Sequence, residues 1–202
     1  MNGIQRIITE LKTSEFYRNI ISLFSGIFAA RFIPALFAIL LARLYVPDNF
    51  GEFVLFLSIA SLLSIFVNCG YESAVILADS SRQKSRIFRF SLRTNLMINL
   101  VTITGIAVYL LFFPGGKKSD NGLILMVPFY AFFFGGLQLI RNILISNKLF
   151  KKLALLEIIR TVSTGALQTL FFVLPENGLF LGVVLSQMIT FFYFIFHLPE
   201  TS

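Results

Sequence analysis

Two arginines lie deep inside apolar segments of the chain, where a cation is energetically costly. Arg31 and Arg160 both occur within hydrophobic runs that are long enough to cross a bilayer. A charged side chain at bilayer depth costs about 2.5–3.5 kcal/mol on insertion scales, so it normally faces a bundle interior or a water-filled cavity. We therefore predict a cationic internal path, and such a path would suit an anionic cargo.

Each buried cation also has a purely structural alternative. Arg31 could form a buried ion pair with Glu72, and Arg160 could pair with Glu157, three residues earlier on the same helix. Arg141 lies close to the end of its apolar segment, so its long side chain could extend to the membrane surface. These alternatives remain open from the residues alone.

Polar residues recur in the apolar segments at intervals of three and four, which places them on shared helix faces. Because lipid cannot satisfy polar groups, we expect these stripes to converge inward. The alternative is that Ser, Thr and Asn side chains hold helices together by hydrogen bonds worth about 1 kcal/mol each. The stripes are Ser58, Ser61, Ser64, Asn68 and Glu72; Asn95, Asn99 and Thr102; Gln138, Arg141 and Asn142; and Glu157, Arg160, Thr161, Thr164 and Gln168.

The composition indicates a membrane protein with an all-α fold. The chain has 202 residues, of which 56% are hydrophobic and only 13% are charged. Soluble domains are closer to a quarter charged. Since a spanning helix needs about 20 apolar residues, this length predicts about six transmembrane helices in one bundle, with little chain left for a separate soluble domain.

The apolar runs and the basic residues between them predict the topology. We expect an interfacial amphipathic helix over 1–18 and a short cytoplasmic tail over 199–202. Lys and Arg concentrate in the N-terminal segment and in the loops around 79–93 and 147–152, so the positive-inside rule places both termini in the cytoplasm. The predicted spans are 19–45, 50–78, 93–113, 122–146, 153–174 and 179–198.

The motifs of several protein classes are missing from the sequence. It has no glycine-rich phosphate loop, no metal-spaced Cys or His set, and no grouping of nucleophile, base and acid in a loop. We therefore expect no enzyme activity, no cofactor and no metal. The basic residues lie between hydrophobic runs instead of forming one patch, so we expect no nucleic-acid partner. Cys69 is the single cysteine, which excludes an internal disulfide.

Four short segments carry a resemblance to a known family. They are the turn Leu40-Leu41-Ala42-Arg43-Leu44-Tyr45-Val46-Pro47-Asp48-Asn49-Phe50-Gly51, the segment Gly70-Tyr71-Glu72-Ser73-Ala74-Val75-Ile76-Leu77-Ala78, and two shorter ones around Asn147-Lys148 and Gly178-Leu179. Over about residues 14–195 the chain resembles the bacterial polysaccharide-biosynthesis, or O-antigen oligosaccharide, flippases. These belong to the multidrug/oligosaccharidyl-lipid/polysaccharide exporter superfamily.

This resemblance implies a fold, a cargo and a set of site residues. Such flippases have two six-helix lobes around a central cavity, so this chain would be a first lobe, truncated or split, needing a second lobe or a second copy of itself as partner. The implied cargo is an undecaprenyl-diphosphate-linked oligosaccharide, moved across the bacterial inner membrane for O-antigen and lipopolysaccharide biosynthesis. Arg31 is then the chief diphosphate ligand, followed by Arg160 and Arg141, because Arg binds phosphates bidentately.

The resemblance leaves the other polar residues with less defined roles. Glu72 and Glu157 are candidates for coupling a proton or sodium ion, or for neutralising the arginines. Asn68, Thr164 and Gln168 are candidate cavity-lining residues. Two alternatives remain: an inactive or structural membrane fragment that needs a partner lobe, and a cation-coupled drug exporter of the same superfamily.

Overall fold

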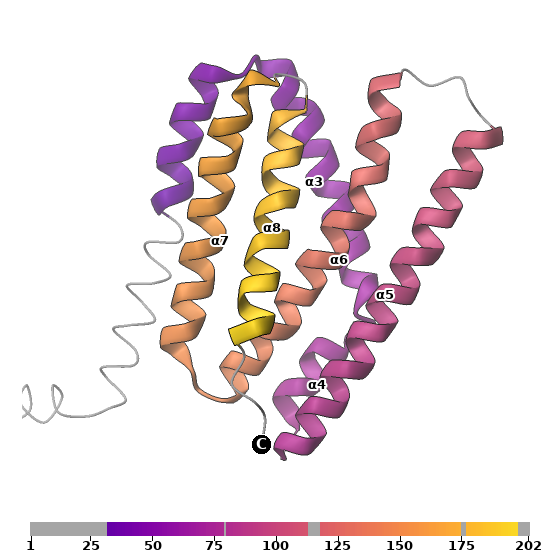
Figure 1. Ribbon diagram of the computed structural model, residues 1–202, viewed down its shortest axis with the longest axis vertical. Coiled ribbons are helices and arrows are strands. Elements are labelled where there is room, and N and C mark those ends of the chain that lie inside the picture. Colours follow the sequence, from indigo (N-terminus) through magenta and orange to yellow (C-terminus); the bar gives the residue numbers. More distant parts are fainter. Residues whose placement is uncertain (1–31, 79, 113–117, 175–176, 198–202) are drawn as a thin grey trace, which may run out of the picture.

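The protein is a bundle of helices in a computed structural model that describes residues 32–78, 80–112, 118–174 and 177–197 (Figure 1). No strand occurs within those ranges. The predicted interfacial helix over 1–18, the tail over 199–202 and Arg31 lie outside the described residues. The elements are an unlabelled helix Phe32–Leu44, α3 Pro47–Val67, α4 Tyr71–Leu77, α5 Ser81–Phe112, α6 Lys118–Ser146, α7 Phe150–Leu170, the 3₁₀ turn η1 Phe171–Val173, and α8 Gly178–His197.

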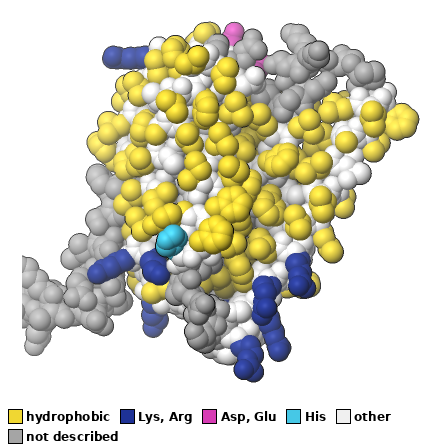
Figure 2. All heavy atoms as spheres, viewed as in Figure 1, with side chains coloured by type: hydrophobic (Ala, Val, Ile, Leu, Met, Phe, Trp, Pro, Cys, Tyr) yellow, Lys and Arg dark blue, Asp and Glu magenta, His cyan; other side chains and the backbone are white. Residues whose placement is uncertain are grey.

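The helices alternate in direction and lie roughly side by side (Figure 1). α4, the α6–α7 connection and the end of α8 all lie at the lower end of the molecule in that view. Figure 2 shows Lys and Arg side chains gathered mainly at this lower end, whereas the visible acidic side chains lie at the upper end. This separation of charge supports the positive-inside argument, and the orientation in the membrane stays a prediction.

Four of the described helices are long and apolar enough to cross a membrane, namely Pro47–Val67, Arg82–Phe112, Ile124–Ser146 and Gly178–His197. Phe32–Leu44 is apolar but shorter over its described part. α7 carries Lys151, Lys152, Glu157 and Arg160, which lower its hydropathy. The all-α membrane fold class is thus confirmed, while the count of six spans stays a prediction.

α6 is the central helix of the bundle. It contacts α3, α4, α5, α7 and α8. In its most apolar stretch 56% of the residues are buried, compared with 11% in α5, so α5 is peripheral. The main apolar cluster joins α6, α7 and α8 through Ile140, Leu144, Leu156 and Phe191. α3 and α8 therefore pack closely on α6, whereas α7 packs mainly on α8.

The second predicted span is not one continuous helix. α3 begins with Pro47 in its first turn and ends at Val67. The missing N–H of proline costs no hydrogen bond there, because the first N–H groups of a helix have no intrahelical acceptor. Cys69 and Gly70 then adopt the left-handed backbone conformation, with φ of 48° and 74°, before α4 begins at Tyr71. The prediction that the stripe from Ser58 to Glu72 follows one helix face is therefore wrong, because the face is interrupted at Asn68.

A tight turn connects α6 to α7. The amide of Leu149 donates to the carbonyl of Leu144, and the amide of Lys148 donates to that of Ile145. Together with the left-handed φ of 56° at Lys148, these bonds form a Schellman motif, which satisfies the last carbonyls of α6. The turn holds α6 and α7 antiparallel, so residues near the end of α6 lie opposite the first turns of α7.

Candidate functional site

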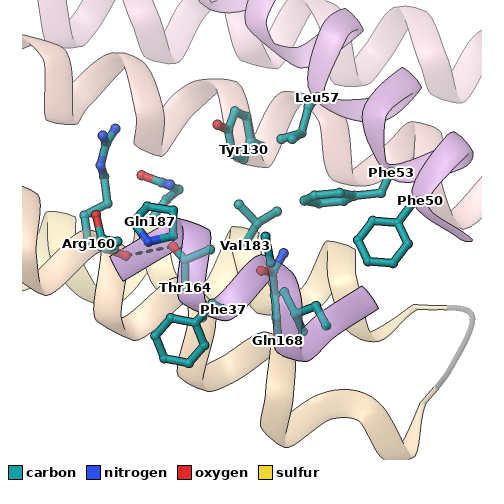
Figure 3. A pocket seen from close by; sticks show the side chains of 15 residues that line it. Phe37, Phe50, Phe53, Leu57, Tyr130, Arg160, Thr164, Gln168, Val183 and Gln187 are labelled. Carbon is teal, nitrogen blue, oxygen red and sulfur yellow. Dashed lines mark hydrogen bonds between the residues drawn. The ribbon is translucent and has the colours of Figure 1, made fainter. Parts of the chain in front are cut away.

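A cavity of about 370 Å³ lies among the helix Phe32–Leu44, α3, α6, α7 and α8 (Figure 3). Its wall combines apolar, aromatic and hydroxyl or amide side chains with one arginine. The lining residues are Pro34, Phe37, Ala38, Leu41, Phe50, Phe53, Leu57, Tyr130, Arg160, Thr161, Thr164, Gly165, Gln168, Val183 and Gln187.

The two ends of this cavity differ in character. Arg160, Gln187 and Thr164 lie toward one end, and Phe50 and Phe53 lie toward the other (Figure 3). Among the described lining residues, the single cation, Arg160, is therefore separated along the cavity from the aromatic end. A space of this kind could hold an anionic group next to a larger apolar or sugar-like part.

The polar end is joined to a cluster of three charges, which we call the charged cluster: Arg141, Glu157 and Arg160. The Arg160 guanidinium donates from Nη2 to Glu157 Oε2 at 2.7 Å, and Arg141 Nε lies 3.6 Å from Glu157 Oε1. The Glu157 side chain is 11% exposed, whereas those of Arg160 and Arg141 are 28% and 42% exposed. Two accessible cations thus share one nearly buried carboxylate, and one positive charge remains uncompensated within the cluster.

Hydroxyl and amide groups fix α7 against its neighbours along the cavity. Thr164 Oγ1 donates to the carbonyl of Arg160, and its oxygen is 2.7 Å from the Ser186 hydroxyl of α8. Gln168 donates from Nε2 to the carbonyl of Leu179, and the Tyr45 hydroxyl donates to the backbone carbonyl of Gln168. These bonds set the rotation of α7 and thereby the direction in which Arg160 faces.

Two glycines allow the close approach that these bonds require. A Cβ at Gly182 would lie 2.6 Å from the Gln168 side chain, and one at Gly165 would overlap the Phe37 ring. Neither clash can be relieved without moving a helix or a ring. Small residues at such contacts are typical of helix packing in membranes, and here they shape one wall of the cavity.

Gln187 and Tyr130 are cavity residues that the sequence stripes did not identify. Gln187 is only 4% exposed, and its Oε1 has no hydrogen-bond partner in the structure. A buried polar group without a partner costs about 1–3 kcal/mol. The available signal was Gln187 itself, next to Ser186 and three residues before Thr190, in the mostly apolar segment Gly178–His197. The predicted site contained no residue of that segment.

Asn68 and Glu72 belong to a different cluster, away from the cavity. Asn68 donates from Nδ2 to Glu72 Oε2 and to the carbonyl of Gly135, both at 2.9 Å. Asn95 Nδ2 donates to Asn68 Oδ1 at 3.2 Å, and Asn99 Nδ2 donates to Asn95 Oδ1 at 2.8 Å. We call Asn68, Asn95 and Asn99 the amide ladder. All three are buried, and neither they nor Glu72 line the cavity described above.

The predicted site residues therefore separate into three groups. Arg141, Glu157, Arg160, Thr164 and Gln168 lie at or next to one cavity, whereas Asn68 and Glu72 bind one another elsewhere; Arg31 is not described. The ion pair between Glu157 and Arg160, which was the structural alternative for Arg160, forms. Arg160 nevertheless also lines the cavity.

The inward convergence expected of the polar stripes holds only in part. Ser64 is buried, but Ser58 and Ser61 are exposed. Ser58 satisfies its hydroxyl within α3, by donating to the carbonyl of Val54. A serine that bonds to its own helix does not need to face inward.

Within the described ranges no cluster of three His, Cys, Asp or Glu side chains could hold a metal ion.

Comparison with known proteins supplies the family. A model of a family described as polysaccharide biosynthesis protein matches residues 16–197, which includes all of the cavity-lining residues. Neither the curated proteins nor the solved structures give a match to this chain. Since the family model covers nearly the whole sequence, the chain belongs to the polysaccharide biosynthesis protein family.

Proposed function

We propose that this protein translocates an undecaprenyl-diphosphate-linked oligosaccharide across the bacterial inner membrane for surface polysaccharide, such as O-antigen, and does so as a transporter and not as an enzyme. Membership of the polysaccharide biosynthesis family supports the general role. The observation that carries the specific proposal is the charged cluster at the polar end of the cavity, where Arg160 lines the wall and shares Glu157 with Arg141.

The chemistry of a diphosphate fits this arrangement. It is a compact anion with several acceptor oxygens, and Arg binds such groups through paired hydrogen bonds. The Arg141–Glu157 contact, at 3.6 Å, is the longer of the two ion pairs. A bound diphosphate would add the negative charge that the cluster lacks. Since electrostatic attraction is stronger in a partly desolvated cavity than in water, a net single cation suffices to favour an anionic head group there.

The proposal includes alternating access between two halves of a transporter. The partner that completes the path would be a second lobe or a second copy of this chain. Support comes from the helix Phe32–Leu44 and from α3, which flank the cavity and also expose large apolar side chains such as Leu36, Ile39, Leu55 and Ile59. Those surfaces can pack against lipid or against another helical lobe.

A vesicle assay tests the proposed transport. The protein, with its completing lobe if one is encoded, is reconstituted in liposomes with undecaprenyl diphosphate that carries a fluorescent oligosaccharide, and flipping is followed by protection from an impermeant quencher. Arg160→Gln should reduce the flipping rate at least about tenfold, because the charge-assisted bonds to phosphate are lost. Lys151→Gln removes one charge from an exposed position of the same helix and serves as the matched control.

The same vesicles separate the rival functions. Undiminished flipping by a correctly folded Arg160→Gln protein would overturn the assignment of the cavity. Uptake of a cationic dye such as ethidium, without movement of the glycolipid, would indicate a drug exporter. If the wild-type protein moved neither probe with its partner lobe present, the structural alternative would stand.

A further inference from the structure

α5 carries two polar faces on opposite sides of one helix. Ser91, Asn95 and Asn99 are buried against the bundle. The other face carries four arginines at intervals of four, three and four residues, and at about 100° per residue they fall within roughly 60° of one another. We call this set the arginine stripe: Arg82, Arg86, Arg89 and Arg93, all of them exposed.

The length of α5 sets the depth of the stripe. The helix has 32 residues, which corresponds to about 48 Å, whereas the hydrocarbon core is about 30 Å thick. The stripe occupies the first turns of α5 and extends over about 16 Å at a rise of 1.5 Å per residue. The part of α5 that follows the stripe, residues 94–112, extends over about 28 Å, which nearly matches the thickness of the core. The stripe therefore lies at the level of the lipid head groups.

Little in the described part of the chain compensates these four charges. None of them forms a salt bridge to a described acidic residue. Arg89 Nε makes only a long bond, of 3.4 Å, to the carbonyl of Ser85. Lys84 differs, since its ammonium group donates to Asn147 Oδ1 at 2.9 Å. Figure 2 shows the resulting row of basic side chains over the lower part of α5, on the outer surface of the molecule.

We propose that the arginine stripe is a second anion site, which binds the diphosphate of the lipid-linked cargo at the cytoplasmic membrane surface before the cargo enters the cavity. This inference rests on the proposed function. The stripe faces outward, so a cargo whose polyprenyl tail remains in the bilayer can reach it directly. Successive arginines are one helical turn apart, about 5–6 Å between Cβ atoms, so two guanidinium groups can engage adjacent phosphates together.

The residue type argues for a phosphate ligand instead of a purely topological role. Positive charge alone sets orientation, and lysine supplies it as well as arginine. Another basic segment at this end of the molecule, between α6 and the first turn of α7, uses lysine at Lys148, Lys151 and Lys152. All four stripe positions instead carry the planar donor group that pairs bidentately with phosphate. A diphosphate offers more charge and more acceptors than the single phosphodiester of a phospholipid, so we assign the stripe to the cargo.

A binding measurement tests the stripe separately from the cavity. The full chain carrying Arg160→Gln is placed in phosphatidylcholine nanodiscs, and undecaprenyl diphosphate binding is measured by native mass spectrometry. Changing all four stripe residues to lysine preserves the charge and should weaken binding about tenfold, because the bidentate bonds are lost. The control changes Lys148, Lys151 and Lys152 to arginine and should alter the affinity less than about twofold, since those positions are outside the stripe.

Two results would overturn this inference. One is unchanged affinity in the four-lysine variant; the other is equal binding of phosphatidylglycerol and undecaprenyl diphosphate, which would make the stripe a general phospholipid surface. The result of this binding measurement can be distinguished from the result of the vesicle flipping assay. Normal flipping without stripe binding would remove only this inference. Stripe binding by a protein that flips nothing would remove the proposed transport and leave the stripe as a diphosphate-binding surface without a role in cargo entry.

Discussion

The charged cluster and the amide ladder arise from similar polar stripes, yet they form different kinds of site. The charged cluster joins α6 and α7 beside a cavity of about 370 Å³. The amide ladder joins α3, α5 and α6 through neutral hydrogen bonds between buried side chains. Of the two, only the charged cluster combines net charge, partly exposed side chains and an adjacent cavity.

The neighbours of each cluster explain this difference. A Cβ at Gly135 would lie 2.8 Å from Asn95 Nδ2 and 3.3 Å from Asn68 Oδ1, so the ladder amides pack directly against the α6 backbone and leave no space there. In the charged cluster, Arg160 lines the cavity wall, and Arg141 reaches Glu157 from α6. Short amides facing a glycine thus connect helices, while a long cation facing a cavity remains available for a ligand.

The largest effect should follow from removal of the shared carboxylate. Glu157→Leu leaves Arg160 and Arg141 without a carboxylate partner. Breaking a fully buried pair costs about 3–5 kcal/mol; because both arginines are partly exposed, we expect about 2–3 kcal/mol here. We expect a clearly lower thermal unfolding midpoint in detergent. The double variant Glu157→Leu/Arg160→Leu should recover most of the stability but none of the flipping. Recovered transport in the double variant would contradict a role for Arg160 in cargo binding.

The amide ladder should respond differently. Asn68→Leu removes the bonds to Glu72, Gly135 and Asn95 and leaves the Asn95 amide with fewer partners in a buried position, at a cost of about 2 kcal/mol. We expect reduced stability with an unchanged flipping rate per folded molecule, because the ladder does not line the cavity. Circular dichroism melts together with the vesicle assay would measure both quantities. A selective loss of transport at full stability would show that the ladder takes part in function.

Glycine substitutions test whether close packing maintains the cavity. Gly165→Ala places a methyl group against the Phe37 ring, and such overpacking costs about 1–3 kcal/mol. Gly105→Ala is the matched control, since no atom lies within 4 Å of its Cβ position; there alanine should stabilise α5 by about 0.5–1 kcal/mol. Thermal melts compare the two variants. Opposite signs are expected, and destabilisation of equal size by both would refute the packing argument.

The smallest change is expected at the link between the charged cluster and α8. Thr164→Val removes the hydroxyl that contacts Ser186 and the Arg160 carbonyl, and interhelical bonds of this kind average about 0.6 kcal/mol. The unfolding midpoint should hardly move. A modest fall in flipping rate is expected, because the rotation of α7 would be less well fixed. A loss of several kcal/mol would mean that this contact is structural.

The helix α8, Gly178–His197, nearly coincides with the predicted span 179–198, and its crossing of the membrane stays a prediction. The helix α5 begins at Ser81, ahead of the predicted span that starts at Arg93, because the sequence interpretation treated residues 79–93 as a basic loop. Charged residues on an outward helix face look like a loop when only hydropathy is considered. The interruption at Asn68 was also missed, because the left-handed conformation of Cys69 next to Gly70 has no signal in periodicity.

Local spacing likewise predicted part of the candidate site. The pair Glu157–Arg160 follows from a separation of three residues within one helix. The contact between Arg141 and Glu157 depends on how α6 and α7 are rotated relative to each other. That rotation cannot be predicted from the spacing of residues in a single sequence. For the same reason, sequence reasoning could not separate the cavity residues Thr164 and Gln168 from Asn68, which occupies an equivalent place in its own stripe.

The bend between α3 and α4 provides an intrinsic chemical probe. Cys69 is exposed at this bend and is the single thiol in the sequence. The helix that is long enough to cross the membrane, Pro47–Val67, ends before Cys69, so we expect the thiol at the membrane surface, where a membrane-impermeant maleimide would label the unmodified protein at one known position. Applied to intact cells and then to inverted vesicles, it would reveal which face of the bilayer the bend occupies, without any engineered residue.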